Sequence, residues 1–495
     1  MTNTLNFLAL DLGAESGRAI LGRFDGRRLV MEEVHRFANG PVRMPSGLHW
    51  DVLRLWSEIK TGIGKAALAT GGHLAGIGID TWGVDFALLD RTGALIGNPH
   101  HYRDGRTDGM LARAFDLMPR DEIFAHTGVQ FMQINTLYQL LAMALNHSPA
   151  LASAHTLLAI PDFFNYLLTG QTVSEFSIAT TTQCCDPRRR TWADPVLAAL
   201  GIPRSIFPAL VDSGADLGPL LADVAAEVGA ATARVIAPAC HDTGSAVAAV
   251  PAEHADFAWI SSGTWSVLGA ELPEPMITPQ SLAYNFTNEG GAGRTFRFCK
   301  NIMGLWLVQE CRRAWAMQGE ELSYGQLTEM AAAAPPLASF VDPNHPDFLK
   351  PGDAQTGWMP TRIQAFCART GQRVPATKGE IVRCALESIA LKYRSVLEQA
   401  EATLGARLDP IHIVGGGARN QLLSRFTADA TGRQVITGPA EATALGNILV
   451  QAVAVRSIGS LAEARSLVRQ TVEVDVFEPG GREGWDEAFE RFEAL

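Results

Sequence analysis

The sequence predicts an α/β protein of two similar halves, each with a mixed β-sheet and helices on its faces. A short apolar run ends in a small-residue turn and returns as a second strand near residue 11, and this pattern recurs near residue 262. Hairpins are followed by alternating helix and strand patterns, which is typical of a mixed sheet covered by helices. The interval between the two hairpins exceeds any solenoid period, so we expect a duplicated domain.

In the first half, Asp25-Gly26 predicts a hairpin turn. Asp51 is placed to cap a helix ending near Ala69, and residues 75–80 predict the next strand. The stretch 86–97 predicts another hairpin, with its turn at 91–93. A loop-rich region with several prolines precedes the expected boundary between two domains, which we place at 1–245 and 246–495.

In the second half, residues 304–316 and about 377–404 predict helices, the second opened by the capping-box pattern T-K-G-E. Its apolar face carries Val382, Leu386, Ile389, Tyr393 and Leu397. A strand at 411–414, a glycine turn and a helix near Asn420 follow. We expect the last strong helix to start near residue 441, and 343–351 to be a surface loop.

Composition excludes several classes of protein. The chain has 495 residues, 47% of them hydrophobic, and a net charge of −11, which argues against a general nucleic-acid binder. The first residues lack the pattern of a signal peptide, and no apolar run is long enough to span a bilayer, so we expect a soluble cytoplasmic protein. The seven cysteines show no C-x-x-C spacing, which predicts reduced thiols. The Cys184-Cys185 pair is interpreted as two buried small hydrophobes in preference to a redox pair.

The first loop, D-L-G-A-E-S-G-R at residues 11–18, has the features of a phosphate-binding turn. Gly13 and Gly17 bracket it, and glycine lets backbone N–H groups approach phosphate oxygens. Asp11 closes the strand where a hydrated Mg²⁺ is able to bridge protein and nucleotide. The alternative is an ordinary hairpin turn, but the similar loop S-S-G-T-W-S at residues 261–266 favours a nucleotide site.

Two acidic stretches suggest a reactive centre. Asp242, between His241 and Thr243, stands at a strand end where a general base is able to take a proton from a substrate hydroxyl, although a helix N-cap fits the pattern equally well. In G-I-D-T-W-G-V-D-F, residues 78–86, Asp80 is placed to reach metal-bound water, and Trp82 and Gly83 to face a polyol. The alternative places Trp82 in the core. We interpret Asp85 as a turn residue.

Two further stretches are weaker signals. The run at 101–108 fits a solvated loop, or else Arg103 and Asp104 orient sugar hydroxyls. The glycine triplet Gly415, Gly416 and Gly417 follows a strand and allows flat packing against an adenine or ribose. It is not G-x-G-x-x-G, so a Rossmann dinucleotide site is disfavoured.

Taken in order, these motifs resemble those of the FGGY-type carbohydrate kinases, in the sugar kinase, Hsp70 and actin superfamily. The resemblance covers the whole chain and rests on D-L-G-A-E-S-G-R, G-I-D-T-W-G-V-D-F, H-D-T, S-S-G-T-W and V-G-G-G. It implies two ribonuclease H-like (actin-like ATPase) domains with ATP and sugar in the interdomain cleft. The stretches Y-R-D-x-R-T, N-T-L-Y-Q-L, N-F-T-N-E-G-G and K-N-I-M-G-L-W resemble those of family members that phosphorylate L-rhamnulose at its 1-hydroxyl, in L-rhamnose catabolism.

The resemblance also implies roles for single residues. Asp242 is then the base, and Gly83, His241, Thr243 and Asn301 line the sugar. Asp11 and Asp80 reach Mg²⁺, through water. The nucleotide contacts it implies are Gly13, Ala14, Glu15, Ser16, Gly17 and Thr264 for the phosphates, and Gln309 with Gly415, Gly416 and Gly417 for the nucleoside.

Other functions stay open at this point. The nearest is a sister kinase acting on L-fuculose, L-ribulose, D-xylulose or glycerol. An ATP-driven chaperone or filament subunit of the same superfamily lacks support, because no substrate-binding β-domain or filament-type insertion is evident. A catalytically silent sugar sensor is disfavoured by the retention of Asp11, Asp242 and both loops. We expect ATP, Mg²⁺ and a small sugar as ligands, no nucleic-acid or membrane partner, and a monomer.

Overall fold

The computed structural model describes residues 4–352, 357–482 and 484–495 of the chain. It divides into two compact units that each combine distant segments. Unit 1 comprises Met1–Pro251, Glu271–Phe298 and Ala442–Thr471, and unit 2 comprises Ala252–Ala270, Cys299–Glu441 and Val472–Leu495. The division into domains 1–245 and 246–495 stays a prediction.

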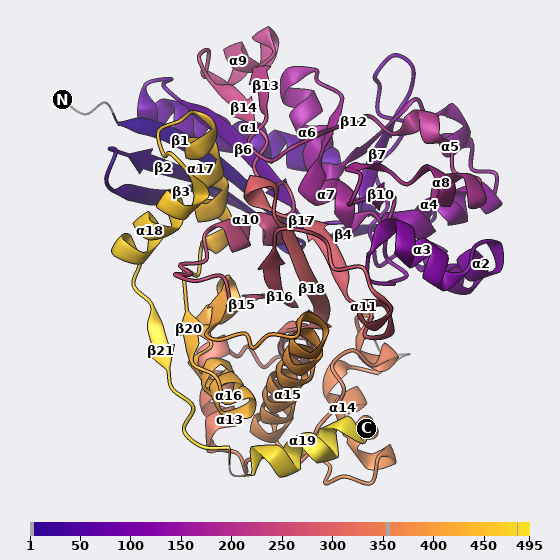
Figure 1. Ribbon diagram of the computed structural model, residues 1–495, viewed down its shortest axis with the longest axis vertical. Coiled ribbons are helices and arrows are strands. Elements are labelled where there is room, and N and C mark those ends of the chain that lie inside the picture. Colours follow the sequence, from indigo (N-terminus) through magenta and orange to yellow (C-terminus); the bar gives the residue numbers. More distant parts are fainter. Residues whose placement is uncertain (1–3, 353–356, 483) are drawn as a thin grey trace. The chain divides into compact units, whose positions relative to one another are not determined.

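Unit 1 is built on a six-stranded mixed sheet (Figure 1). Its strands, in spatial order, are β13 (Asp216–Pro219), β14 (Arg234–Ile236), β6 (Gly76–Thr81), β1 (Leu5–Leu12), β2 (Ser16–Phe24) and β3 (Leu29–Ala38). Strands β1 and β6 are parallel, whereas β2 pairs antiparallel with both β1 and β3. The β2–β3 connection contains Asp25-Gly26, as the sequence predicts.

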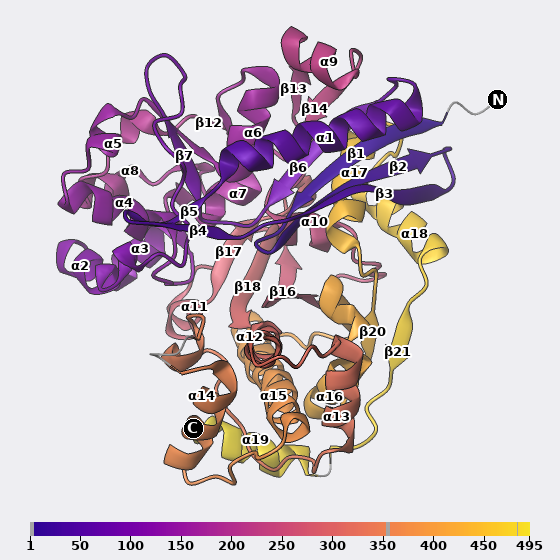
Figure 2. The same cartoon turned by 180° about the vertical axis from the view of Figure 1, so that it is seen from behind.

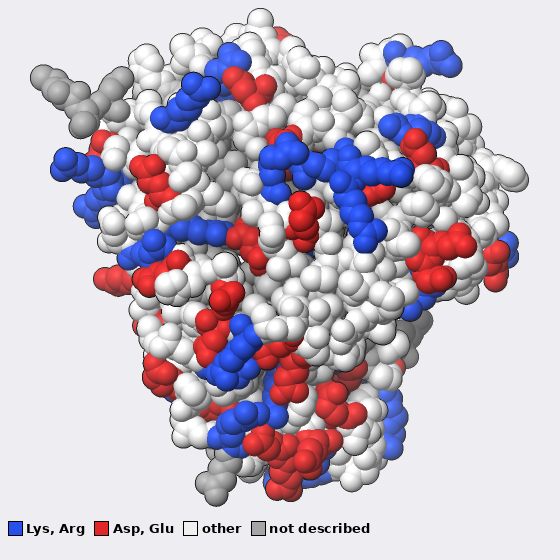
Figure 3. All heavy atoms as spheres, in the orientation of Figure 1, with Lys and Arg blue, Asp and Glu red and all other residues white. Residues whose placement is uncertain are grey.

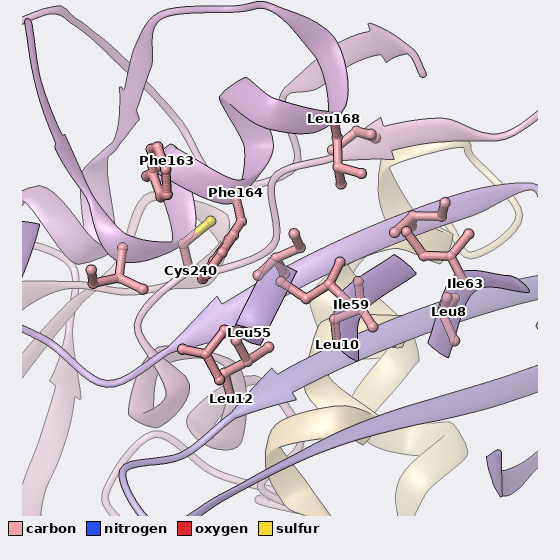
Figure 4. Packing of buried hydrophobic residues seen from close by; sticks show 14 of the residues in the cluster. Leu8, Leu10, Leu12, Leu55, Ile59, Ile63, Phe163, Phe164, Leu168 and Cys240 are labelled. Carbon is pink, nitrogen blue, oxygen red and sulfur yellow. The ribbon is translucent and has the colours of Figure 1, made fainter. Parts of the chain in front are cut away.

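Helices cover both faces of this sheet. Helix α1 (Val52–Thr70) lies in front of it in Figure 2, while α17 (Ala442–Ala454) lies in front in Figure 1. The predicted cap of α1 is confirmed, because the Asp51 carboxylate accepts a hydrogen bond from the Arg54 N–H at 3.1 Å. Figure 4 shows the packing on the α1 side, between Leu8, Leu10 and Leu12 of β1, Leu55, Ile59 and Ile63 of α1, and Phe163, Phe164 and Leu168 of α6 (Ile160–Thr169).

The rest of unit 1 surrounds this core with short elements. The strands are β4 (Pro41–Met44), β5 (Gly47–Trp50), β7 (Phe86–Leu89), β8 (Thr156–Ala159), β9 (Val173–Glu175), β10 (Cys185–Asp186), β11 (Thr191–Trp192), β12 (Ala209–Val211) and β17 (Thr287–Gly290). The helices are α2 (Met110–Leu117), α3 (Arg120–Thr127), α4 (Thr136–Leu145), α5 (Pro149–Ser153), α7 (Phe176–Thr181), α8 (Asp194–Ala199), α9 (Ala222–Val228), α10 (Asp242–Ala248), α11 (Pro279–Ala283) and α18 (Leu461–Thr471).

Unit 2 contains a sheet in which β16 (Trp265–Leu272), β15 (Ala258–Ser262), β19 (Ile411–Val414), β20 (Val435–Thr437) and β21 (Asp475–Phe477) are successive neighbours. Strand β18 (Phe296–Met303) begins in unit 1 and ends in unit 2. The helices are α12 (Trp306–Met317), α13 (Tyr324–Ala333), α14 (Met359–Arg369), α15 (Lys378–Leu404), α16 (Gln421–Thr431) and α19 (Trp485–Glu493). The capping box of α15 is confirmed, since Thr377 and Glu380 each bond the other's backbone, and its predicted apolar face is buried.

The predicted turn at 91–93 is confirmed, because the Asp90 N–H donates to the Ala94 carbonyl at 2.9 Å and Leu89 forms an antiparallel bridge with Leu95; strand β7 pairs in addition with β8. Two other expectations about elements are wrong. Helices α18 and α19 follow α17, which is therefore not the last. The expected surface loop 343–351 includes Phe348, whose side chain is fully buried in unit 2.

The cysteines agree with the prediction of reduced thiols, and the surface carries charges of both signs. All seven cysteines are buried and free, and burial raises the pKa of the Cys184 thiol to about 12. Acidic and basic side chains are interspersed on the face seen in Figure 3. Among the described helices, none is both long enough and apolar enough to cross a membrane.

Candidate active site

Two carboxylates meet at the ends of neighbouring parallel strands. The register of β1 and β6 places Asp11 directly opposite Asp80. Asp11 forms an ion pair with Arg18, which faces it from β2. The sequence placed both acids at strand ends, and the parallel pairing of the two strands brings them together.

Asp80 is the more unusual of the two acids. It is fully buried, its Oδ2 accepts a hydrogen bond from Asn447 Nδ2 at 2.5 Å, and its Oδ1 has no hydrogen-bond partner among the described residues. Burial, followed by the negative charges of Asp11 and Asp242, raises the pKa of Asp80 well above its usual value. Three acids thus share one negative region of unit 1, and a bound cation would relieve their repulsion.

Asn447 comes from α17, far along the chain from Asp80. Its Nδ2 also donates to the Gly78 carbonyl at 3.1 Å, and its Oδ1 accepts from Gln451 Nε2 at 2.6 Å. A Cβ atom at Gly78 would lie 2.3 Å from Asn447 Oδ1, so only glycine leaves room for this amide on β6. Asn447 lies within the helix that the sequence predicts from near residue 441, but its bond to Asp80 was not predicted.

Asp242 is the first residue of α10, and His241 is the N-cap. The reading of Asp242 as the N-cap is therefore wrong, which leaves its carboxylate available for chemistry. Its Oδ1 accepts from the Thr243 backbone N–H at 2.5 Å and hydroxyl at 3.1 Å. The side chain is 32% exposed, so a ligand is able to reach it.

His241 links Asp242 to a buried ion pair. Its Nε2 lies 3.4 Å from Asp242 Oδ1, and its Nδ1 lies 3.1 Å from both Arg297 Nη2 and Glu289 Oε2. Arg297 is fully buried and pairs with Glu289 at 3.1 Å. Burial alone would raise the pKa of Glu289, but the charge of Arg297, together with the contact to His241, outweighs burial and lowers that pKa. Neither Glu289 nor Arg297 was predicted, although Glu289 lies in the N-F-T-N-E-G-G stretch.

The first predicted phosphate loop is the tight turn between β1 and β2. The Gly13 N–H donates to the Ser16 carbonyl at 2.9 Å, and Asn39 Nδ2 donates to the Gly13 carbonyl at 2.8 Å. Ala14 and Ser16 are half-buried and Glu15 is exposed. A Cβ atom at Gly17 would lie 2.2 Å from the Phe37 ring, so this glycine also serves the packing of β2 against β3.

In unit 2, the second predicted loop joins β15 and β16 beside the glycine triplet. The Thr264 carbonyl accepts hydrogen bonds from the backbone N–H groups of Gly304 and Trp306, both at 3.2 Å. These bonds support the start of α12. Gly415 has φ +85°, and a Cβ atom at Gly417 would lie 2.0 Å from Ser262 Oγ. The parallel pairing of β15 with β19 is what places the triplet against the hairpin.

Gln309 and Asn301 lie on neighbouring elements of the same unit. Gln309 is on α12, and its buried Oε1 has no hydrogen-bond partner in the described part of the chain. Asn301 is half-buried on β18. An unsatisfied buried acceptor is a feature that a ligand N–H group is able to satisfy.

The predicted sugar-facing residues of unit 1 fall into two groups. Trp82 is buried and Gly83 half-buried just after β6, and the Thr81 N–H donates to the Cys240 carbonyl at 2.9 Å, which places this segment beside His241. The second group is Arg103 and Asp104. The Asp104 carboxylate accepts hydrogen bonds from the backbone N–H groups of Leu48 at 2.8 Å and Arg106 at 3.0 Å.

The guanidinium of Arg103 lies over the Tyr102 ring, 5.2 Å from its centroid.

A separate cavity of about 440 Å³ in unit 1 is lined by none of the predicted site residues.

The interpretation of Asp85 as a turn residue is also wrong. Asp85 is a buried acceptor of four hydrogen bonds, not an ordinary turn residue. Its sequence neighbours, Gly83 and Phe86, suggest a turn, but long-range partners enclose its carboxylate.

Comparison with known proteins assigns the chain to a family. Residues 6–249 match the N-terminal domain, and residues 258–455 the C-terminal domain, of the FGGY family of carbohydrate kinases. The chain therefore belongs to the FGGY family of carbohydrate kinases, and it is a sugar kinase.

The relatives and solved structures agree with this assignment. The chain is 41% identical to a rhamnulokinase of Bacteroides thetaiotaomicron, over 98% of each chain. It is 40% identical to a rhamnulokinase of Halalkalibacterium halodurans, over 96% of this chain and 99% of that one. Its fold matches a ligand-bound xylulose kinase from Lactobacillus acidophilus with a TM-score of 0.78 at 16% identity, covering 99% of this chain and 96% of the other. The predicted α/β fold class is confirmed.

Proposed function

We propose that this chain transfers the γ-phosphoryl group of ATP to the 1-hydroxyl of L-rhamnulose, giving L-rhamnulose 1-phosphate and ADP, in L-rhamnose catabolism. The observation that carries the proposal is the likeness to rhamnulokinases, which extends over 98% of the chain at 41% identity. The acidic centre around Asp242 supports it, because it supplies the base that such a transfer needs.

In the proposed reaction, Asp242 accepts the proton of the 1-hydroxyl while the bond from O1 to the γ-phosphorus forms and the bond from that phosphorus to ADP breaks. The Thr243 contacts hold the Asp242 carboxylate in one orientation. Phosphoryl transfer asks the protein mainly for positioning and charge stabilisation, and a general base contributes ~10²–10⁴-fold.

We propose that Trp82, Gly83, His241, Thr243 and Asn301 contact the sugar. The support is that Trp82, Gly83 and His241 lie on adjoining segments. Asp104 holds the backbone of its own loop, and Arg103 stacks on Tyr102, so both are proposed to shape this wall of the sugar site.

For the nucleotide, we propose that residues 13–17 and Thr264 contact phosphates, and that Gln309 and residues 415–417 contact the nucleoside. The turns are tight, and glycine has no Cβ to keep a ligand from the backbone; beside Gly416 the space that a Cβ would meet is open. The unsatisfied oxygen of Gln309 is the most specific feature of this set.

The residues present fit Mg²⁺. The described residues contain no set of three or more His, Cys, Asp or Glu side chains arranged to hold a metal. Mg²⁺ usually takes one or two carboxylates and keeps several waters, and the unpaired Oδ1 of Asp80 beside Asp11 matches that need. We propose that Asp11 and Asp80 hold it, through water, where it screens the phosphate charges.

We also propose that the enzyme works in the cytoplasm as a monomer. Seven free, buried thiols suit a reducing compartment. Sedimentation of the purified chain tests the monomer directly.

The test of the proposed function is ADP release with Mg-ATP and each of L-rhamnulose, L-fuculose, L-ribulose, D-xylulose and glycerol. We expect the highest kcat/KM with L-rhamnulose. Preference for another of these substrates would refute the proposed sugar while keeping the kinase, and no sugar-dependent ADP with any of them would refute the proposed reaction.

A further inference from the structure

The carboxylate of Asp85 is the centre of a buried hydrogen-bond cluster in unit 1. Its Oδ2 accepts from Trp50 Nε1 at 2.6 Å, from Trp82 Nε1 at 3.1 Å and from the Tyr102 N–H at 3.1 Å. Its Oδ1 accepts from Gln139 Nε2 at 3.0 Å. One side chain therefore satisfies four donors that come from separate parts of unit 1.

Two of these donors are indoles whose rings also lie against each other at a tilt. The Trp50 and Trp82 rings have centroids 4.0 Å apart and an interplanar angle of 32°. A buried indole N–H needs an acceptor, and both find it in the same oxygen of Asp85. The Asp85 carboxylate thus fixes the orientation of Trp82, the residue just before Gly83.

The backbone between Gly83 and Asp85 is strained. Val84 has φ +68°, which a β-branched residue rarely adopts, and such outliers persist only where surrounding contacts enforce them. The contacts are present: the Val84 N–H donates to Thr181 Oγ1 at 3.2 Å, and the Val84 carbonyl accepts from Thr136 Oγ1 at 2.5 Å and from Gln139 Nε2 at 3.3 Å. Strain of this kind in a loop that presents Gly83 points to function.

We propose that Asp85 is a positioning residue that holds the Trp82–Val84 loop in its strained conformation and thereby sets the affinity of the enzyme for its sugar. The inference rests on the proposed function, in which Trp82 and Gly83 contact that sugar. Asp85 itself is enclosed by protein groups and is not assigned a contact with substrate.

The chemistry of the cluster requires a carboxylate and not an amide. Gln139 donates its Nε2 to Asp85, and its Oε1 accepts from Arg106 Nη2. An Asn at position 85 keeps one acceptor oxygen for the indoles but turns its NH₂ group toward the Gln139 NH₂. Gln139 then has to rotate, which breaks its bond to Arg106 as well. The isosteric change Asp85→Asn therefore disturbs the loop without creating a cavity.

The test compares Asp85→Asn with Glu387→Gln, which converts an equally buried carboxylate of unit 2 to an amide. We expect Asp85→Asn to raise the KM for the sugar roughly 10- to 100-fold, as lost bonds to a charged group imply, with the KM for ATP unchanged. The near-UV circular dichroism of the two adjoining indoles is expected to weaken. Glu387→Gln is expected to leave the sugar KM, the ATP KM and the near-UV circular dichroism unchanged.

A second variant keeps the proposal open to refutation if Asp85→Asn fails to fold. Trp82→Phe removes one donor and keeps a ring, so we expect a smaller rise in the sugar KM, and no further rise when it is combined with Asp85→Asn. A sugar KM within twofold of wild type in Asp85→Asn overturns the proposal, and if that variant does not fold, a sugar KM within twofold of wild type in Trp82→Phe overturns it.

The KM of each variant is compared with that of wild type for the sugar that the wild-type enzyme prefers. A preference for another ketose therefore refutes the proposed substrate and leaves this test intact.

Discussion

Gly446 sits where two helices of unit 1 cross, and replacing it with alanine tests how that packing supports Asp242. A Cβ atom at position 446 of α17 would lie 1.8 Å from the Ser245 carbonyl oxygen and 2.7 Å from its carbon, in α10. Ordinary heavy-atom contacts need about 3.5 Å, so the helices must separate by roughly 1.5 Å. Because α10 begins at Asp242, the carboxylate moves with it.

The expected consequences are both structural and catalytic. Overpacking of this kind costs about 1–3 kcal/mol of unfolding free energy, and a misplacement of about 1 Å at a reacting group costs roughly 100-fold in rate. Calorimetric unfolding and sugar-dependent ADP release measure the two effects. The matched control is Gly325→Ala on α13, where the nearest atom to a new Cβ is Ser323 Oγ at 3.8 Å and helix propensity favours alanine. If Gly446→Ala behaved like Gly325→Ala in both assays, the reasoning from close packing would be refuted.

Three further predictions concern Asp242, Gly417 and Asp85. Asp242→Asn is expected to lower kcat by ~10²–10⁴-fold with nucleotide affinity unchanged in a binding assay, and near-normal turnover would contradict its role as the base. Gly417→Ala is expected to raise the KM for ATP, since its Cβ would lie 2.0 Å from Ser262 Oγ. An unchanged KM for ATP would contradict the proposed contact between the glycine triplet and the nucleotide. Burial, opposed by bonds from Trp50 and other donors, raises the pKa of Asp85 to about 6. The folded state thus holds a proton that the unfolded chain releases near pH 4, so the stability of wild type relative to Asp85→Asn is expected to fall by about 3 kcal/mol as pH rises from 4 to 7, and a flat difference would contradict this shift.

The parts of the site that the sequence predicted depend on local patterns. Asp11 and Asp80 end strands whose apolar runs are visible in the sequence, and the T-K-G-E pattern before α15 gives a cap without reference to the rest of the chain. Each of these features is determined by residues within a few positions, so propensity and turn chemistry are sufficient to find it.

The parts that the sequence did not predict depend on long-range contacts. Asn447 donates a hydrogen bond to Asp80, 367 positions away in the chain, and Arg297 contacts His241, 56 positions away. Asp85 follows a Gly-Val pair that looks like a turn, yet Trp50 encloses it from 35 positions away. Spacing rules carry no information at such separations, because tertiary packing alone brings these partners together.

The measurement that tests the central claim most directly identifies the product formed from L-rhamnulose and Mg-ATP. Phosphorus–proton correlation in the NMR spectrum locates the new phosphate ester, and ADP is measured in the same sample. The account predicts one phosphate ester coupled to the two protons on carbon 1, formed in equal amount to ADP. Coupling to any other carbon, or release of inorganic phosphate in place of an ester, would contradict it.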